Sequence, residues 1–457
     1  SLPMLPPAFH TRLSTLLGNT EAAALIQALT ESEPATSIRL NPTKPSTCFA
    51  EAKLVPWCEQ GRYLAERPRF TYDPLLHAGC YYVQEAASMF VEQAWKVISQ
   101  TIEPHRVLDL CAAPGGKSTL WRSLLPDNCL LVANEPIRQR AQILAENLCK
   151  WGHPDVVVTS AFPAEFAPLH EFFDVIGADV PCSGEGMFRK DEGAVEEWSP
   201  EAVAHCVERQ WTILTDIWDT LKPGGYLVYS TCTFNREENE DQVERICREL
   251  GAEAVALSVD SDWQITGDVT GRNLPVYRFF PHRTQGEGLF LAVVRKTGEP
   301  TSSPSRKRKE RGKKEASVSG GAQLAAWLKE ADAYKLWQAD ESHIVALRKT
   351  LADDMKQVCQ TVRALTAGIT MAEEKGRKLI PQHALALSLA RNEAAFPCVE
   401  LTLEQALAYL RREVLVLPAE TPRGYVLACY ENHPLGFLNN LGARANNLYP
   451  QEWRIRH

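Results

Sequence analysis

The chain has 457 residues and a formal net charge of −8, with 45% hydrophobic and 23% charged residues. This length predicts several domains at the usual ~100–200 residues each, and the composition is typical of a globular protein in water. The negative charge excludes a chain that is basic throughout, so any binding to nucleic acid must use a local patch.

The 13 cysteines form no Cys-x-x-Cys pair, and the chain has no His-Glu-x-x-His motif, so we expect no metal site. The plainest interpretation is a set of reduced thiols in a cytoplasmic protein. The sequence shows neither a basic start followed by an apolar core nor a run of about 18 apolar residues. We therefore expect a protein that is neither exported nor membrane-spanning.

Residues 1–100 are predicted to form a small α/β appendage. Residues 9–29 have helical spacing, and residues 37–44 are expected to contain a short strand ended by a proline. Arg39 and Lys44 could contact phosphates, although each taken alone is more typical of a solvated strand end.

Residues 107–119 read Val-Leu-Asp-Leu-Cys-Ala-Ala-Pro-Gly-Gly-Lys-Ser-Thr. A short apolar run breaks at Pro114-Gly115-Gly116 and is followed by a helical pattern, which predicts a strand, a turn and a helix. In an open parallel sheet, ligands bind beyond the carboxyl ends of the strands, where the amides of a helix N-terminus accept polar groups. This stretch therefore predicts a ligand-binding loop.

The spacing of the glycines indicates which ligand the loop takes. A Walker loop needs a glycine five positions before Gly116, where Cys111 stands, and the dinucleotide fingerprint Gly-x-Gly-x-x-Gly is absent. An S-adenosylmethionine loop remains, formed by Cys111, Ala112, Ala113, Pro114, Gly115, Gly116 and Lys117. Glu135 ends the next predicted strand, 19 residues after Gly116. This spacing is close to the ~20 residues expected for an acceptor of ribose hydroxyls. The alternative is a buried turn with a chance surface glutamate.

Strand and helix patterns alternate from residue 106 to residue 296, as in a parallel α/β sheet. Strands are expected at residues 107–111, 130–134, 155–159, 173–179 and 225–229. Residues 276–281 and 288–294 are expected to form a closing antiparallel pair. A parallel sheet that ends in such a pair is typical of Rossmann-like class I methyltransferases.

The composition changes sharply after residue 297. Residues 298–321 are predicted to be a flexible linker, whose basic run at 306–314 could also attract phosphates. Residues 321–367 are mostly helical in pattern, and short strands alternate with helices from residue 379 onward. The amides, aromatics and arginines of residues 435–456 suit looped RNA, but an ordinary β-rich core edge would have a similar composition.

Two cysteines follow predicted strands beside the ligand loop. Asp179 and Cys182 come after one strand and Cys232 after the next, so we expect all three side chains in one crevice. Enzymes that methylate exocyclic amino groups would instead show Asp/Asn-Pro-Pro-aromatic where this chain has Asp179-Val-Pro-Cys182. A single cysteine at a strand end is more often a small buried hydrophobe, but two flanking one crevice favour chemistry.

Carbon 5 of a pyrimidine is too weak a nucleophile to take a methyl group directly from a sulfonium. A thiolate that adds to carbon 6, with a proton supplied at N3, makes carbon 5 nucleophilic. Methylation and loss of the carbon-5 proton then expel the thiolate. The paired cysteines therefore predict this route, in a partly exposed electropositive pocket that favours the thiolate.

Three motifs resemble those of the Sun/Nol family of RNA (cytosine-5) methyltransferases: Cys111-Ala-Ala-Pro-Gly-Gly-Lys117, Asp179-Val-Pro-Cys-Ser-Gly-Glu-Gly186 and Ser230-Thr-Cys-Thr233. Gly186-Met-Phe-Arg-Lys-Asp191 and the ending Asn446-Asn-Leu-Tyr-Pro-Gln-Glu-Trp-Arg-Ile-Arg456 are similar to the bacterial branch acting on small-subunit ribosomal RNA. The resemblance covers most of the chain apart from the linker.

The resemblance implies roles for these residues. Cys232 would be the nucleophile, Cys182 would assist release of the methylated base, and Asp179 would interact with the cytosine ring. Lys117 and Asp179 would serve both catalysis and cofactor binding, and Glu135 would join the loop in holding S-adenosylmethionine. The family often has an aspartate near the adenine, where this chain reads Thr159-Ser-Ala-Phe162. The adenine contact is therefore left unassigned.

The resemblance also implies an organisation and a partner. We expect an RNA-binding appendage at residues 1–100, a methyltransferase core at 101–297, a linker at 298–321 and a PUA-like α+β RNA-binding region at 322–457. The partner would be ribosomal RNA of the small subunit or its assembly intermediate, bound by a cytoplasmic monomer without metal or membrane.

Two alternatives stay open. The same reaction could act on transfer RNA, because the core motifs do not distinguish substrates. The chain could also be a non-catalytic RNA-binding assembly factor, although the intact Asp179, Cys182 and Cys232 argue against this.

Overall fold

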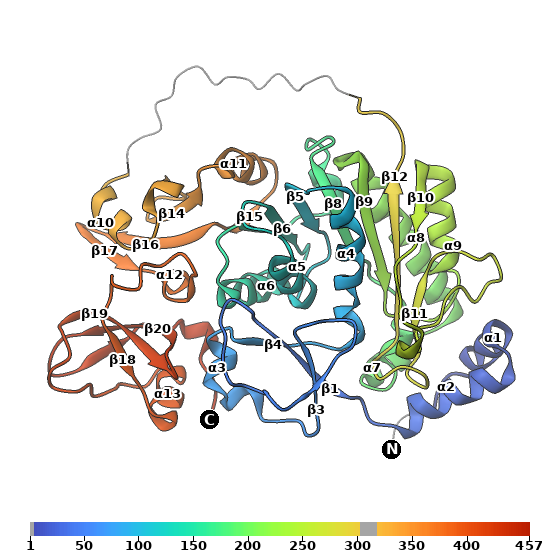
Figure 1. Cartoon of the computed structure of the whole chain (residues 1–457), viewed down its shortest axis with the longest axis horizontal. Helices are drawn as coiled ribbons and strands as arrows, with labels where there is room; N and C mark the ends of the chain where they lie inside the picture. Colours follow the sequence, from blue (N-terminus) through green and yellow to red (C-terminus); the bar gives the residue numbers. More distant parts are fainter. Residues whose placement is uncertain (1–3, 302–317) are drawn as a thin grey trace.

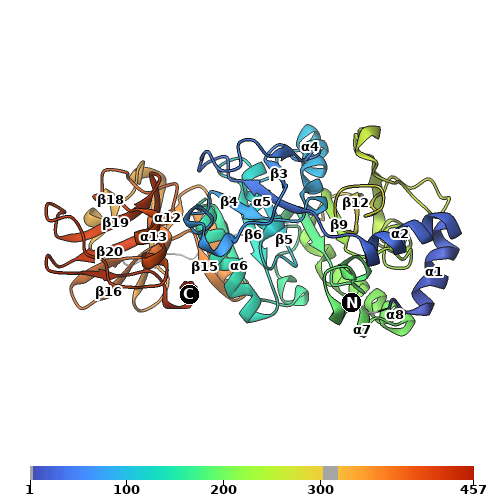
Figure 2. The ribbon, with the colours of Figure 1, turned by 90° about the horizontal axis from the view of Figure 1, so that it is seen from below.

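The computed structural model describes residues 4–301 and 318–457 of the chain. A central sheet lies between two C-terminal sheets at one end of the molecule and the first two helices at the other (Figure 1, Figure 2). The basic run at residues 306–314 lies outside the described residues. Within the described ranges, every helix is too short or too polar to span a bilayer.

Two helices begin the described chain, α1 (Pro7–Leu17) and α2 (Asn19–Glu31). The helical prediction for residues 9–29 is confirmed, with one break at Gly18, whose φ of +85° suits glycine. The apolar faces of both helices pack in one cluster with Phe188 and Trp198. The first two helices therefore lie against the segment that follows Cys182.

The N-terminal sheet has four strands in the order β2-β3-β1-β4, and all of its pairs are antiparallel. Its strands are β1 (Thr36–Leu40), β2 (Lys53–Leu54), β3 (Gly61–Leu64) and β4 (Tyr81–Val83). The helix α3 (Pro74–His77) lies between β3 and β4 in the chain, and α4 (Val91–Thr101) follows β4. The predicted strand is β1, which ends before the proline.

The expectations for Arg39 and Lys44 are wrong, because both side chains are buried. Arg39 donates to Gly116 O at 2.9 Å and to the side chain of Gln84 at 2.7 Å. Lys44 Nζ donates to Ala78 O at 3.0 Å and to the carbonyl of Lys150 at 2.8 Å. These cations therefore tie the N-terminal sheet to the core instead of meeting solvent or phosphates.

The central sheet runs in the order β10-β12-β9-β8-β5-β6-β7-β15, with β11 paired to β12. Its core strands are β5 (Arg106–Asp109), β6 (Leu130–Asn134), β7 (Val156–Thr159), β8 (Phe173–Asp179) and β9 (Leu221–Thr231), all parallel. The strands β11 (Tyr277–Phe279) and β12 (Leu289–Lys296) form the predicted antiparallel pair, and β10 (Ala252–Val255) adds an edge. The prediction of a Rossmann-like α/β core is confirmed.

Helices cover both faces of this sheet: α5 (Gly116–Leu124), α6 (Arg138–Trp151), α8 (Pro200–Ile217) and α9 (Glu240–Arg245) (Figure 1). The short helix α7 (Glu192–Glu197) packs instead in the cluster of α1 and α2. On β5, Val107 packs in the cluster that contains Trp121 of α5. The next residue, Leu108, packs in the opposite cluster with Leu214 of α8. Burial on both faces explains why the core strands are continuous apolar runs.

The helical prediction for residues 321–367 is wrong for most of that segment. It contains α10 (Gly321–Ala326), β13 (Tyr334–Gln338), β14 (His343–Arg348), α11 (Ala352–Thr361) and β15 (Ala364–Ala367). The last of these pairs antiparallel with β7, with Ala364 opposite Thr159. The C-terminal region therefore supplies an edge strand to the central sheet, a long-range pairing that local periodicity does not record.

The remaining C-terminal elements build two four-stranded sheets, β13-β14-β16-β17 and β18-β19-β20-β21. They are β16 (Ile369–Lys375), β17 (Lys378–Pro381), α12 (His383–Leu387), β18 (Cys398–Glu400), α13 (Leu403–Leu410), β19 (Gly424–Tyr430), β20 (His433–Asn440) and β21 (Ala445–Asn447). Leu438 and Tyr449 pack with Ile38 and Tyr81 of the N-terminal sheet. These side chains of the terminal stretch are thus core residues, which confirms the core-edge interpretation for them.

Candidate active site at the carboxyl ends of the strands

The loop between β5 and α5 is held in a fixed conformation. Gly115 has a φ of +128°, which side-chain-bearing residues rarely adopt, and α5 begins at Gly116. Behind the loop, Ser118 Oγ donates to Asp109 Oδ2 at 2.6 Å. Burial raises the pKa of Asp109 to about 6. The first amides of α5 are free of helical partners, so this turn can accept a polar or anionic group.

All seven predicted loop residues, Cys111 to Lys117, lie in this turn and the start of α5. The Cys111 side chain packs partly buried against the core, and burial raises the pKa of its thiol. This cysteine therefore stays a neutral thiol that shapes the loop, which distinguishes it from the two cysteines of the crevice.

Glu135 follows β6 directly and is brought alongside the loop. Ala112 N donates to Asn134 O at 2.8 Å, which joins the loop to the end of β6. The buried carboxylate of Glu135 accepts from Ile137 N at 3.0 Å, and its other oxygen lies 3.6 Å from Arg140 Nη1. A carboxylate at this place can accept two hydrogen bonds from a neighbouring diol.

The segment after β7 lies next to Glu135. Ser160 Oγ donates to Pro136 O at 3.3 Å, and Ser160 N donates to Arg363 O at 2.9 Å. Two large apolar side chains are exposed here, Ile137 at 52% and Phe162 at 66%. The carboxylate of the related family is missing at this place, and apolar surface is present instead.

Asp179, at the end of β8, is held by two side chains. Lys117 Nζ donates to Asp179 Oδ2 at 2.9 Å, and Ser230 Oγ donates to Asp179 Oδ1 at 3.0 Å. Burial opposes the charge of Lys117, but the attraction of Asp179 outweighs it and raises the pKa of Lys117. Lys117 therefore stays charged at neutral pH, and it also lies within electrostatic reach of Cys232.

The two cysteines meet across the ends of neighbouring strands. Cys182 Sγ lies 2.9 Å from Cys232 Sγ, and Cys232 N donates to Cys182 Sγ at 3.4 Å. Because Asp179 of β8 stands opposite Ser230 of β9, the loops after the two strands start side by side. The structure therefore brings the three residues together at the ends of two neighbouring strands, as the topology predicted.

The hydrogen bond between the two sulfurs and burial together raise the pKa of Cys182 well above its ordinary value. Cys182 is therefore the partner that keeps its proton, and the paired sulfurs are chemically unequal. A protonated thiol beside a second sulfur can serve as a proton donor to it.

Sequence reasoning missed two acidic residues beside the cysteines. Glu185 and Glu238 are buried and accept hydrogen bonds from the loops that carry Cys182 and Cys232. Glu185 stood in a motif already singled out, whereas Glu238 lies in a polar run, Asn-Arg-Glu-Glu-Asn, that is typical of a solvated loop. The spacing of that run gave no signal of burial.

The sheet order, the glycine loop and the acidic residue after β6 together define a Rossmann-like methyltransferase. Comparison with known families agrees. A model described as 16S rRNA methyltransferase RsmB/F matches residues 97–295. The N-terminal domain of 16S rRNA methyltransferase RsmF matches residues 5–86, and the methyltransferase RsmF PUA domain matches residues 396–455. The chain belongs to the RsmF family of RNA methyltransferases.

Relatives match over most of their length. Ribosomal RNA small subunit methyltransferase F of Klebsiella pneumoniae is 30% identical over 413 residues, 87% of this chain and 84% of that protein. The protein of the same name from Escherichia fergusonii is 30% identical over 474 residues, 98% of this chain and 96% of that protein. The fold is similar to that of NSun6 from Pyrococcus horikoshii, solved with SFG, at a TM-score of 0.56 and 20% identity, over 65% of this chain and 100% of that one.

Proposed function

We propose that the protein transfers the methyl group of S-adenosylmethionine to carbon 5 of a cytosine in 16S ribosomal RNA, through a covalent adduct on Cys232. The observation that carries the proposal is the contact of 2.9 Å between the sulfurs of Cys182 and Cys232, beside the ion pair of Lys117 and Asp179. Methylation of an exocyclic nitrogen would need no thiol at this place, whereas carbon-5 methylation needs a nucleophile that adds and leaves.

The chemistry follows from the roles of these groups. The Cys232 thiolate adds to carbon 6 of the base, a proton is taken up at N3, and carbon 5 becomes nucleophilic. In this scheme Asp179 interacts with the cytosine ring, and the hydrogen bonds that it accepts from Lys117 and Ser230 fix its orientation. After methyl transfer, water accepts the carbon-5 proton, N3 returns its proton to solvent, and the bond between carbon 6 and Cys232 Sγ breaks. The protonated Cys182 thiol donates a hydrogen bond to the departing thiolate.

The residues of the loop fit S-adenosylmethionine, which supplies an electrophilic methyl group when bound. Residues Cys111 to Lys117 offer amides at the start of α5 to its amino-acid end, and the buried carboxylate of Glu135 offers acceptors to its ribose. The exposed side chains of Ile137 and Phe162, next to Ser160, offer an apolar surface to the adenine. This surface takes the place of the aspartate that the sequence lacks.

The relatives' names support 16S ribosomal RNA as the substrate, and the C-terminal match to a PUA domain supports RNA capture by that region. The target cytosine must leave any stack to reach the crevice, which costs a few kcal/mol, so an unpaired cytosine is favoured. The chain is acidic overall, so capture relies on local cationic segments, including residues 306–314, and should weaken with salt.

The test is a denaturing gel of purified variants incubated with S-adenosylmethionine and RNA. Cys232→Ala is expected to abolish turnover and form no adduct, because carbon 5 is never activated. Cys182→Ala is expected to accumulate a denaturation-resistant protein–RNA adduct that contains methylated cytosine. Cys247→Ala, which changes a half-buried cysteine outside both the cysteine pair and the C-terminal region, serves as the control.

The same experiment is run with 16S ribosomal RNA, assembled small subunits and transfer RNA as separate substrates. Methyl transfer to transfer RNA alone would overturn the substrate assignment. An adduct with Cys232→Ala and none with Cys182→Ala would reverse the two roles, and product identified as N4-methylcytosine would exclude the carbon-5 reaction.

A further inference from the structure

Glu185, three residues after Cys182, reaches across to the loop of the other cysteine. Its Oε1 accepts from Thr233 Oγ1 at 2.7 Å and from the backbone amides of Phe234 and Asn235 at 2.9 Å each. Its Oε2 accepts from Trp198 Nε1 at 2.9 Å. Every one of these partners is a donor, so the side chain acts as a carboxylate acceptor at both oxygens.

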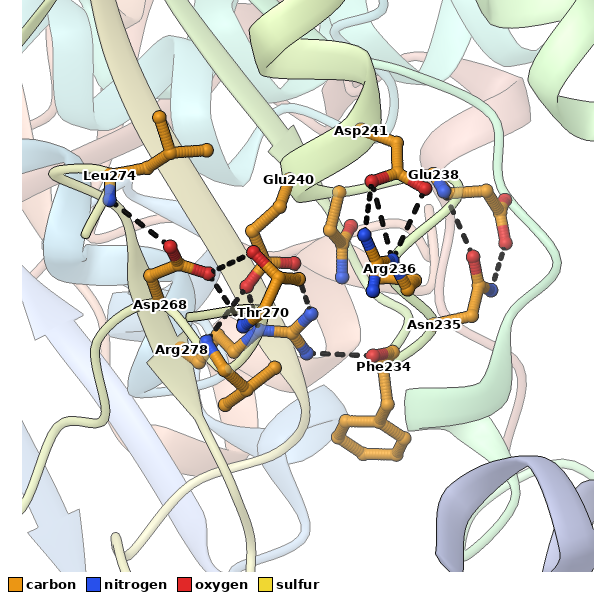
Figure 3. A network of polar contacts seen from close by, with 12 residues as sticks. Phe234, Asn235, Arg236, Glu238, Glu240, Asp241, Asp268, Thr270, Leu274 and Arg278 are labelled. Carbon is orange, nitrogen blue, oxygen red and sulfur yellow. Dashed lines mark hydrogen bonds and ion pairs between the residues drawn. The ribbon is translucent and has the colours of Figure 1, made fainter. Parts of the chain in front are cut away.

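Glu238, six residues after Cys232, reaches across in the opposite direction. Its Oε1 accepts from Ser183 N and from Gln210 Nε2, both at 2.9 Å. Its Oε2 accepts from Ser183 Oγ at 2.5 Å and from Asn235 Nδ2. Figure 3 shows the two contacts that join Glu238 and Asn235. Glu238 therefore fixes the backbone of the residue that follows Cys182.

The two carboxylates are joined through hydroxyl groups on the residues that follow the cysteines. Ser183 Oγ lies 2.9 Å from Thr233 Oγ1, so an unbroken chain of contacts runs from Glu238 to Glu185. Gly186 N also donates to Cys232 O at 2.8 Å, and a Cβ on Gly186 would lie 2.6 Å from that oxygen. The two loops are thus held together at several points next to the sulfurs.

The loop of Cys232 is also held from a second side, by Arg278. Arg278 Nη1 donates to Phe234 O at 2.7 Å, while Arg278 Nε donates to Glu240 at 2.9 Å (Figure 3). The side chains of this ion pair are fully buried. Because the loop of Cys232 is held by Glu185 from one side and by Arg278 from the other, a change at Glu185 acts on a loop that otherwise stays folded.

We propose that Glu185 and Glu238 are positioning residues that act on opposite cysteines. Glu185 holds the loop of the nucleophile Cys232 in place for attack, and Glu238 holds the loop of Cys182 in place for release. The inference rests on the proposed function and adds to it two buried side chains that act through the cysteine loops.

The first experiment measures the attack step. In a Cys182→Ala background, which traps the adduct, Glu185→Gln is added and adduct formation is followed in a single turnover with 16S ribosomal RNA and S-adenosylmethionine. The amide must place donor hydrogens against Trp198 or against the amides of the loop, so the loop shifts. Adduct formation is expected to slow by about 10–100-fold, as a displacement of about 1 Å at a reacting atom does.

The second experiment measures the release step. Glu238→Gln, with both cysteines intact, turns an NH₂ group toward donors that now bind its carboxylate. Methyl transfer is expected to proceed, while the protein–RNA adduct accumulates on a denaturing gel and turnover falls by about 10–100-fold. A merely structural defect would lower the rates of attack and of release together, and would leave no trapped adduct.

Matched variants keep the inference testable if either glutamine variant fails to fold. Thr233→Val and Ser183→Ala each remove one hydroxyl from the network and are expected to slow attack and release, respectively, by roughly 5-fold. Glu249→Gln changes an exposed carboxylate that pairs with Arg245 on the surface, and is expected to leave both steps unchanged. Thermal melting and cofactor affinity are measured for every variant.

The outcomes separate the two claims. If Cys182→Ala alone forms no adduct, the covalent route is wrong, and the positioning roles fall with it. If Cys182→Ala forms the adduct but Glu185→Gln does not slow it, or folded Glu238→Gln traps none, the positioning roles are wrong and the proposed function stands.

Discussion

Arg348 Nε lies 2.8 Å and 3.0 Å from the two carboxylate oxygens of Asp155, although the residues are 193 positions apart. The Asp155 side chain is fully buried just before β7, and Arg348 ends β14. Asp155 also accepts a hydrogen bond from Asn128 N at 2.8 Å. This ion pair ties a C-terminal sheet to the central sheet, next to the place where β15 pairs with β7.

We expect Arg348→Ala to lower the free energy of unfolding by about 3–5 kcal/mol, because it leaves a buried carboxylate without its cation. Urea unfolding measures the change. Arg248→Ala removes an exposed arginine paired with Glu244 and should change stability by less than about 0.5 kcal/mol. Equal, small effects in both variants would contradict a structural role for the pair with Asp155.

Deletion of residues 318–457 should weaken cofactor binding as well as RNA binding. The deletion removes β15 from the edge of β7 and takes away the carbonyl of Arg363 that holds Ser160 N. A region that only captured RNA could be removed without loss of cofactor affinity. Calorimetric titration of the folded fragment of residues 1–317 with S-adenosylmethionine distinguishes an RNA-capturing region from one that also supports the cofactor site. An affinity equal to that of the full chain would show that the edge strand is dispensable.

Glu135→Ala should weaken S-adenosylmethionine binding by about 1.5–3 kcal/mol, because it removes hydrogen bonds between a charged acceptor and the ribose. Titration calorimetry of the folded variant measures the loss. Glu201→Ala, which changes an exposed glutamate in the first turn of α8, is the control. Unchanged affinity in Glu135→Ala would rule out this placement of the ribose.

Asp109→Asn should flatten the dependence of stability on pH between about pH 4 and about pH 6. Burial raises the pKa of Asp109 from 3.8 to about 6, so in this window the folded protein keeps a proton that the unfolded chain has lost. The stability of the native protein from this source therefore falls as pH rises, and the loss is complete above the folded pKa. Asparagine does not ionise, and Ser118 can still donate to its oxygen.

Urea unfolding at pH 4.5 and pH 7 measures the effect on Asp109. The free energy of unfolding of Asp109→Asn, minus that of the native protein, should be larger at pH 7 than at pH 4.5. Asp216→Asn, at an exposed position of α8, should follow the native profile. A variant at Asp109 with the native slope would show that its carboxyl does not titrate in this range.

The core of the fold could be predicted because its strands are buried on both faces. Runs such as Val156–Thr159 contain only buried residues, so local composition and final environment agree. The meeting of Cys182 and Cys232 followed from topology, since the carboxyl ends of adjacent parallel strands share one edge. The chemical inequality of the two sulfurs did not follow, because it depends on the hydrogen bond between them and on burial, which the spacing of the motifs does not record.

The wrong predictions for Lys44 and for residues 321–367, and the omission of Glu238, have a common physical cause. In each case the residues pair with partners that are far away in the sequence. Lys44 is buried because a carbonyl 106 residues away accepts from it. The strand β15 has four residues, Ala-Leu-Thr-Ala, whose pattern is weak without the edge of β7. Glu238 lies in a run that is polar throughout, and its burial is compensated by Ser183 and Gln210 from other elements.

The edge strand also sets an order of events for the nascent chain. Thr159 of β7 leaves the ribosome 205 residues before Ala364, its partner in β15, which at about 5–20 residues per second is a delay of about 10–40 s. Throughout that interval the backbone groups along one side of β7 have no strand to pair with, and an open sheet edge invites pairing between chains. The chain therefore completes its central sheet only after β15 has been made.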